Sequence, residues 1–210
     1  ESGVTPSGHC HIGHFREAIT TNLVAFALKD MGYKSRHIHM WDDYDRFRKV
    51  PANVPQSYSE YIGLPDFKVP DPDGCHSSFA DHFMEPFEKS LSEAGMKPDF
   101  LRASDQYKNG VYRDNIKISL DKKDKLIELL NSQRGGEKIA PDWYPVSIYC
   151  PKCGKDFTKV NSYDGEYGLR YSCKCGFEET ADIRKANYLK LQWRVDWPSR
   201  CAELGVDYEP

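Results

Sequence analysis

The sequence predicts an α/β fold with a parallel sheet and a small inserted metal-binding module. Short apolar runs alternate with segments of helical period over residues 1–131. This order is typical of parallel strands joined by helices. The composition then changes, because residues 146–180 are rich in Cys, Gly, Lys and Tyr. Four of the seven cysteines lie in that segment as two close pairs, which indicates a metal site in a reducing environment.

The first elements follow from residues 1–41. The chain opens on what reads as the end of a strand. A helix is predicted over His14–Met31, where Gly32 supplies a stop signal. Its apolar residues recur near a 3.6-residue period at Phe15, Ile19, Leu23, Phe26 and Ala27. The apolar segment Ser35–Trp41 predicts the next strand.

The following stretch is interrupted by prolines. Residues 50–76 contain five of them and predict a long loop or insertion, and loops of that length are functional or held in place. A second helix is expected to end near Gly95, with a kink or break at Pro86. It is indicated by the four-residue spacing of Phe79, Phe83, Phe87 and Leu91. A strand over Asp99–Ala103 and a helix over Asn109–Asn131 complete this half.

Composition limits the classes of function. The formal net charge of −3 gives no overall case for nucleic-acid binding, so any such contact must come from local patches. The sequence contains no run of eighteen apolar residues, so it does not indicate a membrane span. The start carries no secretory signal, so we expect a cytoplasmic protein. The absence of an initial Met and the abrupt end at Pro210 suggest a fragment of something longer.

The cysteine pairs predict a zinc module over residues 146–180. Cys150 and Cys153 are separated by two residues, whereas Cys173 and Cys175 are separated by one. Tight turns with a cysteine at each end present thiolates to one tetrahedral ion, and two such turns on adjacent hairpins form a zinc ribbon. The alternative is a set of buried free cysteines. The shorter second spacing leaves open whether Cys175 is the fourth ligand.

A second candidate metal site lies at the end of the proline-rich stretch. Four competent ligands fall within twelve residues: Asp71, Cys75, His76 and His82. His82 follows Cys75 by two helical turns, which places the two on one face of a helix. This mixed set of oxygen, sulfur and nitrogen donors suits zinc.

Three histidines near the start, His9, His11 and His14, allow three interpretations. They are metal ligands, core residues, or groups that face a substrate. A strand that leads through a glycine-containing turn into a helix places the helix N-terminus at the sheet edge, where phosphate is favoured. His11 and His14 would face the same direction on the first turn. The sequence has neither a Walker lysine nor a G-x-G-x-x-G motif.

The acidic run Asp42, Asp43 and Asp45 follows the predicted second strand. It reads either as a magnesium site or as a solvated strand end, and the second interpretation is the commoner one for such a run.

Taken together, these motifs resemble a known family. The segment PSGHCHIGH resembles the HIGH signature of class I aminoacyl-tRNA synthetases. The wider stretches SGVTPSGHCHIGHFREA, WDDYDRFRKVP, DPDGCHSSFADHF and WRVDWPSRCAELGVDYEP are similar to the class I lysyl-tRNA synthetases. The resemblance implies a Rossmann-type catalytic domain over residues 1–145, a zinc-bearing insertion over 146–180, and a return to the catalytic domain over 181–210.

The resemblance also implies a reaction and its residues. Lysine is activated by ATP, with magnesium, and is transferred to tRNA(Lys). By similarity, His11 and His14 are catalytic and contact the ATP phosphates. Pro6 and Gly8 shape the turn, and Gly13 lies under the adenine. Gly3, Thr5, Trp197 and Ser199 match lysine-pocket positions, although from the sequence alone Trp197 is equally well an ordinary core residue. The family carries a zinc at the cluster of Asp71, Cys75, His76 and His82.

One family feature is missing. The Lys-Met-Ser-Lys-Ser-like loop does not occur in these 210 residues, so we expect binding of lysine or ATP at best, with weak adenylation. Two other functions are compatible with the sequence. One is a class I synthetase for glutamate or cysteine. The other is a non-catalytic zinc-ribbon RNA-binding module, with local support from the basic stretch Lys117–Lys125, which also reads as a solvated helix face.

Overall fold

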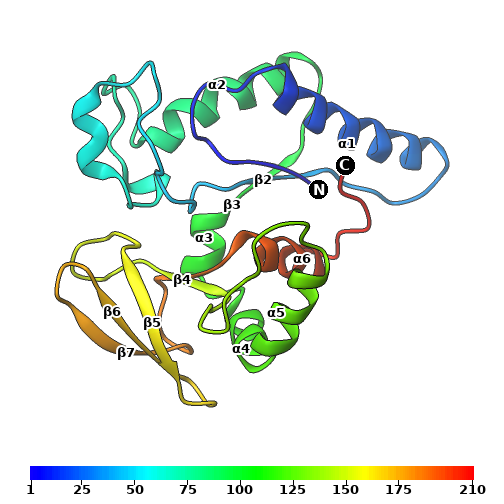
Figure 1. Ribbon diagram of the computed structural model, residues 1–210. Helices are drawn as coiled ribbons and strands as arrows, with labels where there is room; N and C mark the ends of the chain where they lie inside the picture. The colour runs from blue at the N-terminus through cyan, green and yellow to red at the C-terminus, as the bar shows by residue number, and fades with distance from the viewer. The chain divides into compact units, whose positions relative to one another are not determined.

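A three-stranded parallel sheet organises the first part of the computed structural model, which describes all residues from Glu1 to Pro210 (Figure 1). Its strands are β1 (Ser2–Val4), β2 (Ile38–Trp41) and β3 (Asp99–Arg102), in the order β1-β2-β3. Ser2 pairs with His39, and Ile38 pairs with Asp99. Both β1 and β2 are buried throughout, as parallel sheets require. The prediction of an α/β fold with a parallel sheet is confirmed.

The chain divides into two compact units. The first holds residues 1–106 and 205–210, and the second holds residues 107–204. In the first unit, α1 (Ile12–Asp30) and α2 (Phe79–Glu93) lie on the same side of the sheet (Figure 1). They build one core, which contains Val4, Ala18, Trp41, Ala80, Met84, Phe87, Leu91 and Met96. Burial of the larger aliphatic and phenyl side chains in this core contributes roughly 1.5–3 kcal/mol each.

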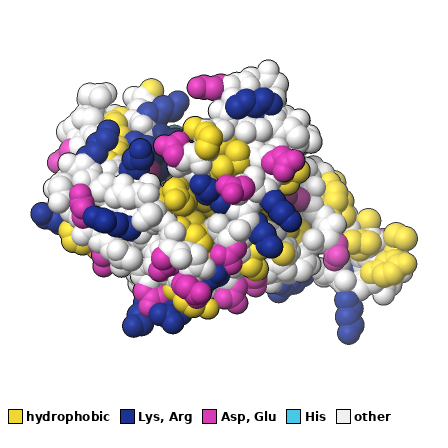
Figure 2. All heavy atoms as spheres, turned by 60° about the horizontal axis from the view of Figure 1, so that its bottom comes forward, with side chains coloured by type: hydrophobic (Ala, Val, Ile, Leu, Met, Phe, Trp, Pro, Cys, Tyr) yellow, Lys and Arg dark blue, Asp and Glu magenta, His cyan; other side chains and the backbone are white.

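Helix α1 differs from its prediction in two respects. It begins at Ile12 instead of His14, because His11 caps it. Of the side chains that set the predicted period, only Phe15 and Ile19 pack against the core. Leu23 is 58% exposed and Phe26 is 62% exposed, whereas the buried residues are Ala18, Thr21 and Ala25. Figure 2 shows hydrophobic side chains gathered on a part of the molecule that projects at the right. None of the helices is long and apolar enough to cross a membrane.

Residues 50–76 form a packed loop with two short 3₁₀ helices, η1 (Gln56–Tyr61) and η2 (Asp66–Lys68). A second apolar cluster holds the loop in place, and its buried members are Phe47, Val54, Val69, Phe79 and Phe83. Of the kink or break predicted at Pro86, the break is wrong, since α2 runs through this residue to Glu93, and the kink stays a prediction. Pro86 has no backbone N–H, so α2 lacks one hydrogen bond at this residue, but the helix continues past it.

The second unit contains helices and two small antiparallel sheets. The predicted single helix over Asn109–Asn131 is wrong. The segment forms α4 (Arg113–Asp121) and α5 (Lys123–Ser132), separated at Lys122, after α3 (Ala103–Lys108). Strands β4 (Val146–Ile148) and β8 (Leu189–Leu191) pair, and α6 (Trp193–Leu204) follows them. Strands β5 (Thr158–Tyr163), β6 (Gly168–Cys173) and β7 (Glu178–Asp182) form the other sheet. The domain boundaries expected at 145 and 180 stay a prediction.

Candidate active site and metal-binding clusters

Two stacked imidazoles begin α1. The ring centres of His11 and His14 lie 4.0 Å apart at an interplanar angle of 19°. His11 Nδ1 accepts the N–H of Gly13 at 3.0 Å, and His14 Nδ1 accepts the N–H of His11 at 3.2 Å. Because both Nδ1 atoms accept, the proton of each neutral ring is on Nε2. Burial and the neighbouring His11 lower the pKa of His14, which favours this neutral form.

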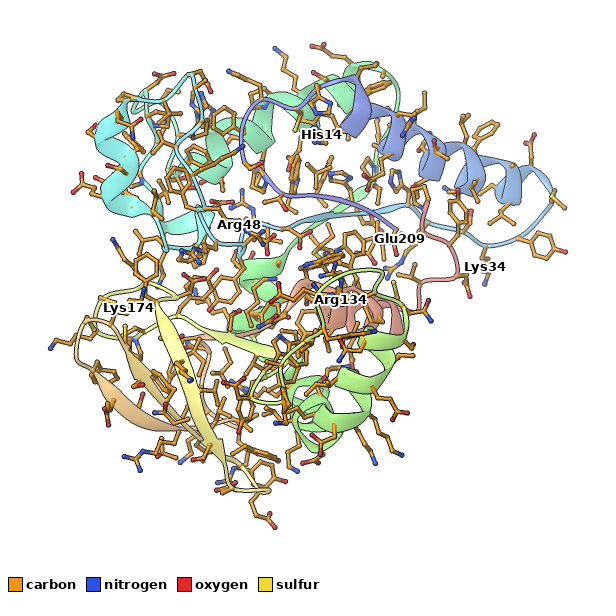
Figure 3. The ribbon with its side chains drawn as sticks, viewed as in Figure 1. His14, Lys34, Arg48, Arg134, Lys174 and Glu209 are labelled. Carbon is orange, nitrogen blue, oxygen red and sulfur yellow. The ribbon has the colours of Figure 1, made fainter.

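These rings therefore present two Nε2–H donors at a helix N-terminus, beside backbone N–H groups and the positive end of the helix dipole. Both residues are at least partly exposed, and Figure 3 shows His14 on the first turn of α1. Donors in this place suit a phosphate group. Neither of the two clusters that could hold a metal ion includes His9, His11 or His14.

Two glycines make this turn possible. Gly8 has φ of +154°, in the range that favours glycine. A Cβ on Gly13 would lie 2.8 Å from Cε1 of His11, so a side chain there would displace the capping ring. Pro6 is buried between β1 and the turn.

The residues at the end of β1 form hydrogen bonds to neighbouring carboxylates. Gly3 donates its N–H to Glu17 Oε1 at 2.7 Å, and Thr5 donates its hydroxyl to Asp45 Oδ2 at 3.1 Å. Asp43 accepts the N–H and the hydroxyl of Ser104. Burial raises the pKa of Asp43 to about 6. The interpretation of this acidic run as a solvated strand end is wrong, because Asp42 and Asp43 are buried.

Asp66 extends the acidic region, and sequence reasoning missed it. It is 1% exposed, and neither carboxylate oxygen has a hydrogen-bond partner. Burial, and then the negative charges of Asp45 and Asp43, raise its pKa well above the usual value. No local sequence signal marks this residue, because it lies in the proline-rich loop after Pro65, about twenty residues beyond Asp43 and Asp45.

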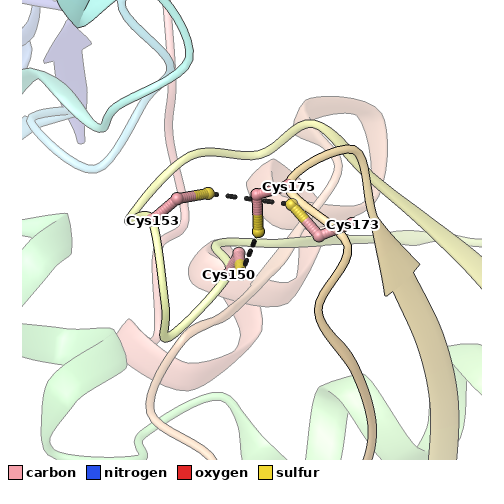
Figure 4. Close-up of side chains that lie close together, drawn as sticks. All are labelled: Cys150, Cys153, Cys173 and Cys175. Carbon is pink, nitrogen blue, oxygen red and sulfur yellow. Dashed lines mark hydrogen bonds between the residues drawn. The ribbon is translucent and has the colours of Figure 1, made fainter.

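The four cysteines of the predicted zinc module come together (Figure 4). Their sulfur atoms all lie within 4.8 Å of one another. Sγ atoms of Cys150 and Cys175 are 3.7 Å apart, as are those of Cys153 and Cys173. The C-x-C pair forms its own turn, in which Gly176 donates to the carbonyl of Cys173. The backbone N–H of Phe177 lowers the pKa of Cys175 to about 7. Cys175 therefore belongs to the cluster despite its shorter spacing.

The second predicted cluster also converges. One ligand atom from each of Asp71, Cys75, His76 and His82 lies within 4.8 Å of the others. Nδ1 of His82 is 2.9 Å from Asp71 Oδ1 and 3.4 Å from Cys75 Sγ. Nδ1 of His76 is 3.0 Å from the same sulfur. Both histidines thus turn the same ring nitrogen inward.

Carboxylates face the outer nitrogens of these histidines. Nε2 of His76 lies 3.4 Å from Glu85 Oε2, and Nε2 of His82 lies 3.6 Å from Asp73 Oδ2. A metal-binding histidine usually donates its other N–H to such a group, which fixes its tautomer and orientation. The sequence analysis missed Asp73 and Glu85, although both lie within three residues of a predicted ligand.

The second unit carries the remaining expected residues. Trp197 lines a cavity of about 630 Å³ together with Arg134 and Arg194, and the Arg200 guanidinium lies 4.9 Å from its ring centre. Ser199 donates its hydroxyl to the carbonyl of Val195 at 2.8 Å. Gly3 and Thr5 belong to the first unit. In the basic stretch Lys117–Lys125, Lys117 pairs with Asp121 at 2.6 Å, as expected of a solvated helix face.

Comparison with known proteins decides the family. The sequence model of the tRNA synthetases class I (K) matches residues 1–210. The chain belongs to this family. It is 49% identical to a lysine–tRNA ligase of Pyrococcus horikoshii and 51% identical to one of Pyrococcus furiosus, in each case over 100% of this chain and 40% of the relative. A lysine–tRNA ligase of Borreliella burgdorferi is 46% identical over the same share of each.

Membership of the class I (K) family agrees with the resemblance drawn from the opening motif. The chain spans about 40% of the length of these relatives. These 210 residues contain the paired histidines, the acidic residues after β2 and both clusters that could hold a metal ion.

Proposed function

We propose that the chain is the part of a lysyl-tRNA synthetase that binds lysine and ATP and forms lysyl-adenylate. The observation that carries this proposal is the pair of Nε2–H donors on His11 and His14 at the start of α1. Lysine relatives cover the whole chain, which favours lysine over glutamate or cysteine as the amino acid. The same relatives weigh against a non-catalytic RNA-binding module.

In the proposed reaction the lysine carboxylate attacks the α-phosphate of ATP, and pyrophosphate leaves. The terminal hydroxyl of tRNA(Lys) then takes the lysyl group and AMP leaves. His11 and His14 donate to phosphate oxygens and stabilise the charge that grows on them, which is the usual role of preorganised donors. Pro6, Gly8 and Gly13 hold the backbone that places these rings, with Gly13 under the adenine. Magnesium accompanies the nucleotide as its counter-ion.

The proposed lysine residues are Gly3 and Thr5 of the first unit and Trp197 and Ser199 of the second. A lysine pocket needs an apolar wall for the four-carbon stem and acceptors for the ammonium. Trp197 offers the wall, with a cation–π contribution. In the first unit, Thr5 donates its hydroxyl to Asp45, and the carboxylate of Asp45 is an acceptor of the kind that an ammonium group needs.

Zinc fits both clusters. Four thiolates at mutual ligand distance suit a tetrahedral structural site, in which zinc supplies folding energy to the ribbon of residues 146–180. Asp71, Cys75, His76 and His82 offer a mixed set that zinc also accepts. Because thiolate ligands need reducing conditions, we place the protein in the cytoplasm. We also propose that the first unit, with its parallel sheet, is a Rossmann-type nucleotidyltransferase domain.

Binding of non-hydrolysable aminoacyl-adenylate analogues to this chain tests the proposal. We expect the lysyl analogue to bind at least tenfold more tightly than the glutamyl and cysteinyl analogues. His11→Asn and His14→Asn should each weaken it roughly 10- to 150-fold, the value of one hydrogen bond to a charged group, while asparagine at position 11 still caps the helix. His9→Asn, at an exposed histidine of the same loop, is the matched control and should stay within twofold. Equal binding of the three analogues would refute the proposal.

A further inference from the structure

A half-buried carboxylate of α1 lies against the edge strand β1, and the proposed chemistry does not yet use it. Oε1 of Glu17 accepts the backbone N–H of Gly3 at 2.7 Å. Glu17 is half-buried, and Gly3 is buried in β1. A residue that we assign to the amino-acid site is therefore in direct contact with a carboxylate from the helix that carries the paired histidines.

No cation of the chain neutralises this carboxylate. Glu17 forms no ion pair, and its Oε2 accepts no hydrogen bond. The charges that act on it belong to Glu209, which Figure 3 labels, and to Asp42, and both are negative. Burial, and after it these two charges, raise the pKa of Glu17 against the opposing effect of the Gly3 N–H. A half-buried carboxylate with negative neighbours is stabilised when a cation binds beside it.

Glu17 lies on the same face of α1 as one of the two phosphate-facing histidines. It follows His14 by three residues, and side chains at this spacing are neighbours on a helix surface. Thr21, four residues further, continues the face, and its hydroxyl donates to the carbonyl of Glu1 at 3.4 Å. The face that begins at the Nε2–H donors therefore continues along β1, and a substrate bound at these donors can extend toward Glu17.

The position of Glu17 along the helix fits the side-chain ammonium of lysine better than the α-ammonium. Glu17 follows the cap residue His11 by six residues, so helical rise places it about 9 Å along the axis of α1. In extended lysine the side-chain nitrogen lies about 7.5 Å from the carboxyl carbon, whereas the α-nitrogen lies about 2.5 Å from it. The reacting carboxylate belongs beside the phosphate at the histidines, so the far nitrogen is the one that reaches Glu17.

We propose that Glu17 selects lysine by binding its side-chain ammonium through Oε2, while Oε1 keeps the N–H of Gly3. This inference rests on the proposed function, which places lysine at Gly3 and Thr5. Asp45 can share the same ammonium, because that group has three donors. Neither of the two clusters that could hold a metal ion includes Glu17. An amino acid with an uncharged side chain leaves the carboxylate without its partner, and a site rejects an analogue in this way.

The test compares two non-hydrolysable adenylate analogues, lysyl and norleucyl, which share a four-carbon stem and differ in the terminal ammonium. The parent chain should bind the lysyl analogue roughly 10- to 150-fold more tightly, the value of one hydrogen bond to a charged group. Glu17→Gln keeps an acceptor for the Gly3 N–H, so it should lose most of this preference while norleucyl binding stays within about twofold. Glu88→Gln is the matched control, because Glu88 is a half-buried carboxylate of α2 that accepts the indole N–H of Trp41 at 2.8 Å.

The ratio of the two affinities separates a binding role of Glu17 from a structural one, because a loss of structure weakens both analogues alike. A preference that disappears in Glu17→Gln but not in Glu88→Gln, with unchanged circular dichroism, supports the inference. A preference that persists in Glu17→Gln overturns it, as does equal weakening of both analogues. Magnesium chloride that displaces the lysyl analogue from the parent chain but not from Glu17→Gln assigns the carboxylate to a metal ion and also overturns it.

The inference and the proposed function fail through different measurements. A parent chain that prefers the lysyl over the glutamyl and cysteinyl analogues, yet binds the norleucyl analogue equally well, overturns the role of Glu17 alone. The proposed function fails if the parent chain shows no preference for the lysyl analogue over the glutamyl and cysteinyl ones.

Discussion

Lowering the pH should destabilise the first unit through a histidine buried in its sheet. His39 is 0% exposed in β2, where it contacts the rings of Trp41, Phe87 and Phe100. Its Nδ1 shares the Ser2 hydroxyl, at 2.8 Å, with Nε2 of the neighbouring His37. Its Nε2 has no partner. Burial, and then nearby histidine charges, lower the pKa of His39 to about 3.

The size of the effect follows from that pKa. The unfolded chain takes up the proton near pH 6.5, whereas the folded chain resists it until about pH 3. Stability from this residue is therefore complete above pH 6.5 and is lost as the pH falls toward 3. At 1.36 kcal/mol for each pH unit, the loss is about 2 kcal/mol by pH 5 and about 5 kcal/mol in all. His37, whose pKa falls to about 4, acts in the same direction. Asp43, with a raised pKa, opposes them.

Urea unfolding at pH 7.5 and pH 5.0 measures this contribution. The quantity to compare is the change in unfolding free energy between the two pH values, for the parent chain and for His39→Gln. The difference between these two changes isolates His39, because the other titrating groups are common to both proteins. We expect the parent to lose about 2 kcal/mol more than the variant. His9→Asn, at an exposed histidine, should behave like the parent. If His39→Gln showed the full pH dependence of the parent, a neutral buried His39 would be refuted.

Three further predictions concern the metal clusters and the surface. Elemental analysis should find two zinc ions in the parent chain and one in Cys150→Ser, whose ribbon should also become protease-sensitive because small zinc modules need the metal to fold. Asp73→Asn and Glu85→Gln should each weaken zinc at the second cluster by about 10- to 100-fold in a chelator competition, with Glu93→Gln unchanged. An unchanged affinity in both would show that these carboxylates do not orient the histidines. Phe26→Ser should change the unfolding free energy by less than about 0.5 kcal/mol, whereas a core position would lose several times that amount.

Local patterns predicted most of the elements but not what they bury. The helical period placed α1 within two residues of its start, yet Leu23 and Phe26 of that period are exposed. Helix α1 has 19 residues and is about 28 Å long, whereas the four residues of β2 span only about 13 Å. The far half of the helix therefore has no sheet beneath it. The hydrophobic period predicts the helix. Which of its turns pack on the sheet depends on the length of the strands, and those strands are formed by other parts of the chain.

The candidate site shows the same division between local and distant information. Both metal clusters were predictable because cysteine and histidine at these spacings are typical zinc ligands, even though the two cysteine pairs lie 20 residues apart. Asp66 was not, because its neighbours Asp43 and Asp45 lie about twenty residues earlier and meet it only after the proline-rich loop has packed. The burial of Asp43 depends in the same way on Ser104, which is 61 residues away.

The loop that carries the paired histidines is fixed by hydrogen bonds at its two ends and borders α2 between them. Thr5 is bonded to Asp45 after β2, and His11 closes the first turn of α1. Between them, the ring of His9 meets Phe83 of α2 edge-on at 5.0 Å and lies 6.4 Å from His82 of the second cluster. Donors act on a transition state only if their positions are fixed beforehand. Thr5 and His11 supply the hydrogen bonds that fix the loop, whereas the exposed His9 makes ring contacts alone, so removal of its ring should leave His11 and His14 in place.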